Sequence, residues 1–161
     1  MRELTQVCKA VVEALKSAGV TALEAFPDSA KRYEGAVAAV TVGAAEGKTL
    51  GFCNYLGEVQ DSATGAVREL YGKQLEGNIT VDIRAERAGE CEAGSETAML
   101  GSLPAGIRPG ELRWEALTWE RATGMFLRRG NLRCQAVFTA ESREDGEGFL
   151  DFILKGVMKR E

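Results

Sequence analysis

The stretch of this chain that comes closest to a catalytic motif is GAAEGKT, at residues 43–49. A phosphate-binding loop has the pattern GxxxxGK[ST], whose glycines let backbone amides wrap a phosphate ahead of a helix. Here only three residues separate Gly43 from Gly47, one too few, and a strand-like run follows. The segment therefore predicts a tight polar turn that joins two apolar strands, at residues 33–42 and 50–56, into a hairpin.

Cysteine chemistry is the second possibility, and the sequence argues against it. A cysteine nucleophile needs a base, usually histidine, to form its thiolate, and the chain contains no histidine. There is no CxxC pair for zinc or redox work, and Glu90 and Glu92 disfavour a thiolate between them. We expect no metal and no cofactor, and we interpret all four cysteines as small buried residues: Cys8, Cys53, Cys91 and Cys134.

Carboxylates are the remaining group that could catalyse a reaction. Several gather in ESREDGEG, at residues 141–148, where mixed charge is typical of a solvated turn. Asp82 and Asp151 lie within expected strands, and a solvent-facing position explains Asp82 equally well. The sequence thus predicts a protein that is not an enzyme.

A basic cluster surrounds the segment GMFLRRGN. Its arginines are Arg121, Arg128, Arg129 and Arg133. One interpretation is a solvated hairpin tip. The other is a contact surface for an acidic protein partner or passing nucleic acid, with Met125 and Phe126 as exposed apolar anchors.

The element that must organise these groups runs from Val67 to Arg87. Between Lys73 and Ala85 its odd positions are mostly apolar and its even positions polar. Period two predicts a strand with one buried face, about 40 Å long, with a bulge at Gly72 or Gly77. The polar positions must meet water or another hydrophilic surface; they include Gln74, Asn78, Thr80 and Asp82.

Helical periodicity appears in two places. Apolar residues at three- and four-residue steps predict an amphipathic helix at residues 2–18, ended by Gly19. A second helix is expected at residues 89–103, although glycines at 94 and 101 weaken it.

The remaining segments predict short strands and turns. Residues 20–27 are expected to be extended, and 57–65 to form a mobile loop. A bulge or strand change is expected near Ala116, followed by strands at 132–141 and 149–158. This order predicts one α+β domain over residues 1–161: a mixed, mostly antiparallel twisted sheet with the N-terminal helix and the second helix packed on it.

Composition limits the class of protein. The chain has 161 residues, a formal net charge of −4 and a pI near 5.1, which disfavours sequence-specific nucleic-acid binding. No stretch approaches the roughly 18 apolar residues that span a bilayer, and the N-terminus lacks the pattern of a signal peptide. We expect a cytoplasmic protein with no membrane partner.

Several segments, taken in order, resemble small virion proteins of long-tailed bacteriophages and their prophages, in particular tail terminator (tail-completion) proteins. These segments are VVEALKSAG, TALEAFP, GKQLEGNITVDIRA, TGMFLRRGNLRCQAVFTA and DFILKGVMK. The resemblance implies a homo-oligomeric ring, usually a hexamer. Such a ring caps the tail tube, sets where polymerisation stops, and joins the tube to the head connector in the virion tail.

The resemblance also assigns the two candidate surfaces. The polar positions of the long strand would face a neighbouring subunit or the lumen of the ring, and the arginine-bearing hairpin would contact partners. Two alternatives stay open: a tail tube or other minor tail protein, and a small-molecule-binding α+β domain with a deep pocket.

Overall fold

Two long strands, β4 (Val67–Ala85) and β7 (Met125–Glu141), form the centre of the structure. They pair antiparallel from Leu70↔Glu141 to Ala85↔Phe126 without a register shift. The pairing confirms the long two-faced strand expected from the sequence. The computed structural model describes residues 2–25, 33–49, 55–60, 62–99, 103–141 and 152–155.

Shorter strands line both edges of this central pair. Along β4 lie β2 (Val37–Thr49) and β3 (Tyr55–Gln60), and β1 (Thr21–Leu23) pairs with β2. Along β7 lie β5 (Ile107–Trp114), β6 (Thr118–Glu120) and β8 (Ile153–Leu154). Among the described strands, only β1 and β2 run parallel. The sheet is therefore mixed and mostly antiparallel, and the fold is α+β as expected.

The first helix, α1 (Arg2–Ser17), ends where its sequence predicts. Gly19 adopts a φ of 93°, in the left-handed region that favours glycine. The Gly19 amide donates to the Lys16 carbonyl at 3.0 Å, and the Val20 amide to the Leu15 carbonyl at 3.0 Å. This pair of bonds is a Schellman cap, and it turns the chain directly into β1.

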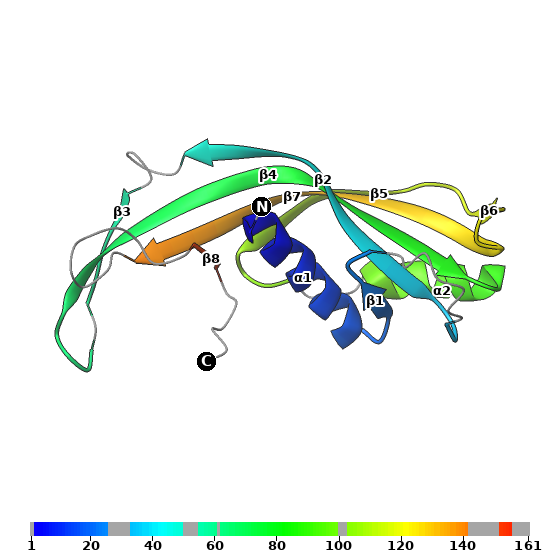
Figure 1. Cartoon of the computed structure of the whole chain (residues 1–161), viewed down its shortest axis with the longest axis horizontal. Helices are drawn as coiled ribbons and strands as arrows, with labels where there is room; N and C mark the ends of the chain where they lie inside the picture. The colour runs from blue at the N-terminus through cyan, green and yellow to red at the C-terminus, as the bar shows by residue number, and fades with distance from the viewer. Residues whose placement is uncertain are drawn as a thin grey trace.

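The second helix, α2 (Ala88–Met99), packs on the same side of the sheet as α1 (Figure 1). It begins as expected and is described as far as Met99; residues 100–102 lie outside the described part of the chain, and Leu103, the predicted last residue, is not helical. Cys91, Gly94 and Ser95 are buried, and the Cys91 thiol donates to the Ile83 carbonyl at 3.3 Å. A Cβ on Gly94 would lie 2.5 Å from the Ala36 Cβ. Glycine thus lets the helix approach the sheet closely.

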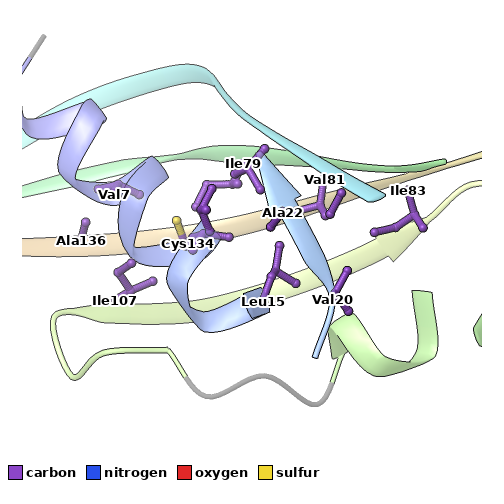
Figure 2. Packing of buried hydrophobic residues seen from close by; sticks show 14 of the residues in the cluster. Val7, Leu15, Val20, Ala22, Ile79, Val81, Ile83, Ile107, Cys134 and Ala136 are labelled. Carbon is purple, nitrogen blue, oxygen red and sulfur yellow. The ribbon is translucent and has the colours of Figure 1, made fainter. Parts of the chain in front are cut away.

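The hydrophobic core lies between the helices and the odd-numbered face of β4. Val7, Val11 and Leu15 recur along one stripe of α1 and are buried in the core. Figure 2 shows Val7 and Leu15 on the side of α1 that faces the sheet. They meet Ile79 and Cys134, from β4 and β7. We call this the inner face of the sheet, and the opposite one the outer face.

The predicted hairpin turn at residues 43–49 is wrong. These residues continue β2, which pairs with β4 up to Thr49↔Lys73. The pairing shifts by one residue between Val42 and Ala45. The polar, glycine-rich sequence thus forms a strand that contains a bulge and not a turn.

The glycine expected to carry a bulge in β4 lies opposite that bulge instead. A Cβ on Gly77 would lie 2.9 Å from the Ala44 carbonyl oxygen and 3.0 Å from the Ala45 Cβ. Gly77 therefore makes room for the bulged neighbour, while β4 itself stays regular against β7.

Three further predictions can be compared with the structure. The strand change near Ala116 is confirmed, because β5 ends at Trp114 and β6 begins at Thr118. The mobile loop at 57–65 is wrong in its first half, where β3 runs to Gln60. Of the strand expected at 149–158, residues 153–154 form β8, and most of the rest lies outside the described residues.

Candidate interaction surfaces

The outer face of the sheet carries the polar positions of β4 and β7. Both helices pack on the inner face, since α1 meets Ile79 and α2 meets Ile83, which share one parity of β4. The four β4 residues singled out from the sequence all lie on the outer face: Gln74, Asn78, Thr80 and Asp82. Asn78 is exposed and the other three are half-buried.

Charged side chains on the outer face pair across the strands. Arg129 Nε donates to Asp82 Oδ1 at 3.0 Å, and this contact raises the pKa of the arginine. Glu76 accepts hydrogen bonds from Lys48 at 2.6 Å and from Gln135 at 2.7 Å. Both hold the pKa of Glu76 below its ordinary value. The outer face is therefore an ordered, ionised surface.

A further ion pair secures the end of this face near β6. Arg84 Nε donates to Glu120 at 2.9 Å, and Thr123 Oγ1 donates to the same carboxylate at 2.7 Å. The arginine, and then the threonine, lower the pKa of Glu120. This contact ties β6 and the following turn to β4.

The arginines predicted as one basic cluster separate onto different sides of the sheet. Arg129 and Arg133 lie on the outer face. Arg128 lies on the inner face, opposite Ile83, with its guanidinium carbon 5.9 Å from the centre of the Trp114 ring. Arg121 is exposed in the turn after β6. Adjacent residues of a strand point to opposite faces, so the four cannot form one surface.

The expectation that Met125 and Phe126 are exposed anchors is wrong. Met125 is buried. Phe126 is half-buried and packs edge to face on Trp119, with ring centres 4.9 Å apart. The exposed aromatic residue here is Trp119. The Phe126 ring packs against the core and separates Trp119 from it.

Charge reversal at Arg128 and at Arg129 should have unequal effects. Arg128→Glu removes a cation from the Trp114 ring and places a carboxylate among half-buried apolar groups, so we expect about 2–3 kcal/mol of lost stability. Arg129→Glu acts at an exposed pair, and about 1 kcal/mol or less is expected. Urea unfolding of both variants measures the difference. Equal losses would show that the two side chains share one environment.

An arm extends beyond the helices at one end of the molecule (Figure 1). We use this name for the hairpin of β3 with residues 67–71 of β4. It carries four of the five large apolar side chains that are exposed in the described chain: Tyr55, Leu56, Val59 and Val67. Val67 is 58% exposed. The sequence predicts a loop for residues 57–65 of this region because they are polar and rich in turn-forming residues, whereas residues 67–71 belong to the predicted long strand.

An apolar cavity lies under the inner face. It has a volume of about 400 Å³ and is bounded by α1, β5 and the segment before β5. Its lining is apolar and includes Val11, Leu15, Ile107 and Trp114. The Trp114 Nε1 is buried and has no hydrogen-bond partner in the part of the chain that the structure describes.

Within the described residues, no group of three potential ligands could hold a metal ion. The thiols of Cys8, Cys91 and Cys134 are free, and burial raises the pKa of each. Cys53 lies outside the described residues. No described helix is long and apolar enough to cross a membrane.

No protein-family model matches this chain, and no curated protein matches it significantly. The surfaces described above, and the resemblance of the sequence segments to tail terminator proteins, are therefore the features that bear on function.

Proposed function

We propose that this protein is a tail terminator subunit encoded by a prophage. Its copies form a homo-oligomeric ring, a hexamer as in most proteins of the family it resembles, on the end of the tail tube. The ring joins the tube to the head connector. The observation that carries the proposal is the arm, with its four exposed apolar side chains. The order of the resembling segments supports the choice of the tail family.

The arm favours contact with another chain for a physical reason. A two-stranded hairpin is marginally stable in water unless a third strand or a packing partner covers it. Clustered exposed apolar side chains typically mark a protein–protein contact. In the described chain neither helix packs on β3. A neighbouring subunit would supply the missing cover.

A contact made by the arm is suited to a closed ring. The arm lies at one end of the molecule (Figure 1), and in a ring it would be received by a different surface of the next copy. Such a heterologous interface repeats from subunit to subunit and closes when the rotation allows. The ordered polar outer face then offers a hydrophilic surface toward a neighbour or the ring lumen.

The test compares the wild-type chain with an arm variant, Val59→Asp with Val67→Asp. Both residues are exposed, so folding should persist while two charges oppose the apolar contact. Native mass spectrometry is expected to find a ring for the wild type and a monomer for the variant. Ser17→Asp with Ala25→Asp, which adds the same charge at exposed positions outside the arm, should still assemble.

Function is measured on tail tubes polymerised from the tube protein of the same prophage. The wild-type chain should bind tube ends and stop elongation, and the arm variant should not. A wild-type monomer at high concentration that also fails to bind tubes would contradict the proposal. Long tubes grown from this chain alone would identify the tube subunit instead. A monomer that binds a small apolar molecule in the 400 Å³ cavity would favour the ligand-binding alternative.

A further inference from the structure

The helix α2 presents unbalanced negative charge. It carries Glu90, Glu92 and Glu96 and no basic residue. Glu92 and Glu96 are exposed, and among the described residues none of the three forms an ion pair. Residues four apart lie on one side of a helix, about 6 Å from each other. Glu92 and Glu96 thus form a pair of neighbouring carboxylates.

The outer face presents unbalanced positive charge at one place. Arg108 and Arg133 line a hollow of about 220 Å³ next to the bulge in β5. Both are exposed, and neither has an ion-pair partner in the described chain. We call this hollow the arginine hollow.

The carboxylates near the arginine hollow already form ion pairs with other cations. Glu76, which also lines it, accepts from Lys48 at 2.6 Å, and Glu111 pairs with Arg113 at 3.2 Å. The charge of Arg133 also helps to lower the pKa of Glu76, but neither Arg133 nor Arg108 forms an ion pair with a described residue, so both guanidinium groups can bind a further carboxylate. Such groups bind carboxylates through paired N–H donors.

These two surfaces cannot meet within one molecule. The helix α2 packs on the inner face, where Cys91 bonds the Ile83 carbonyl. Arg133 lies opposite Asn78, on the outer face. The sheet separates them, so they point in opposite directions.

We propose that the partner of the arginine hollow is a second copy of this chain, whose α2 places Glu92 and Glu96 against Arg108 and Arg133. The inference rests on the proposed ring and names a charged contact in it, separate from the arm. The charge complementarity selects the occupant: two adjacent carboxylates meet two unpaired guanidinium groups. The contact is heterologous, as ring closure requires.

A charge swap tests this contact. One variant is Arg108→Glu with Arg133→Glu, and the other is Glu92→Lys with Glu96→Lys. Sedimentation velocity at low salt is expected to show at least a tenfold weaker self-association for each variant alone, because like charges then face each other. An equimolar mixture should regain association, since each altered surface then meets its opposite. The wild-type association should weaken as salt is raised.

A matched control separates the contact from net charge. Glu13→Lys with Glu24→Lys makes the same change in net charge as Glu92→Lys with Glu96→Lys, at exposed positions away from both surfaces, and it should associate like the wild type. Circular dichroism melts establish that all variants fold. A mixture that stays dissociated, or a variant that associates alone as well as the wild type, overturns the inference.

The outcomes also distinguish this inference from the proposed function. If the wild type and both charge variants all form rings, the proposed ring stands and the proposed contact between α2 and the arginine hollow is wrong. A wild-type chain that never self-associates overturns the inference by itself, and tube capping then decides the function. Unchanged rings from Arg108→Glu with Arg133→Glu, together with lost retention on duplex DNA, would assign the hollow to phosphate instead.

Discussion

Replacing Phe138 with alanine is expected to lower the free energy of unfolding by about 3–5 kcal/mol. The Phe138 side chain is fully buried. It lies in β7 at the point where β4 and β8 flank it, opposite Lys73 and Leu154. Removing the ring leaves a cavity that regular strands on both sides cannot easily fill, so the loss includes a cavity term as well as lost burial.

The control for this variant is the preceding residue in the same strand. Val137 points to the outer face and is half-buried, so Val137→Ala should cost about 1 kcal/mol, because it removes little buried surface. Urea unfolding followed by circular dichroism measures both losses. Similar losses for the two variants would mean that the inner face near β8 is not the core.

Replacing Gly94 with leucine should remove about 3 kcal/mol or more of stability. A Cβ at this position already lies 2.5 Å from the Ala36 Cβ and 3.3 Å from Ile83 Cγ2. A full side chain must therefore push α2 away from the sheet, and overpacking of this kind is destabilising. Ser95 and Cys91, two buried residues of the same helix, would lose their packing at the same time.

Gly89 provides the matched control within the same helix. A Cβ on Gly89 meets nothing within 4 Å, so Gly89→Ala should leave stability unchanged or raise it by about 0.4–1 kcal/mol through lower entropy of the unfolded chain. Thermal unfolding of the two variants gives the comparison. A harmless Gly94→Leu would show that α2 does not pack closely on Ala36 and β4.

Elements with long, regular periodicity could be predicted from the sequence. The helix that ends at Gly19 and the strand from Val67 each bury one face, and burial of a periodic stripe is the main signal that a sequence carries. The strand change near Ala116 could be predicted for the same reason, because the parity of the apolar residues reverses there. These predictions are confirmed.

The errors arise where pairing between distant strands overrides local sequence. The letters GAAEGKT favour a turn, but β4 offers a partner along their whole length, and a bulge opposite Gly77 accommodates the mismatch. The second half of β3, at residues 57–60, was predicted as a loop because its sequence is polar and does not alternate. Tertiary context decides such segments.

The candidate surfaces could be predicted in part. The polar positions of β4 follow from period two alone, and they lie together on the outer face. The division of the arginines between two faces also follows from strand alternation, once β7 is known to begin at Met125. The exposure of Trp119 and the burial of Met125 could not be predicted, since they depend on how β6 pairs with β7.

The unbroken pairing of β4 with β7 also determines when the chain can fold. Leu70 pairs with Glu141, about 70 residues later in the chain. At a synthesis rate of about 5–20 residues per second, β4 leaves the ribosome several seconds before β7. During that time its alternately apolar edge has no β7 to pair with, and such edges promote aggregation. Contacts this distant in sequence also slow folding. The central pair therefore forms only after β7 has been synthesised, which leaves incomplete chains exposed to chaperones and proteases and restricts assembly to chains that already contain β7.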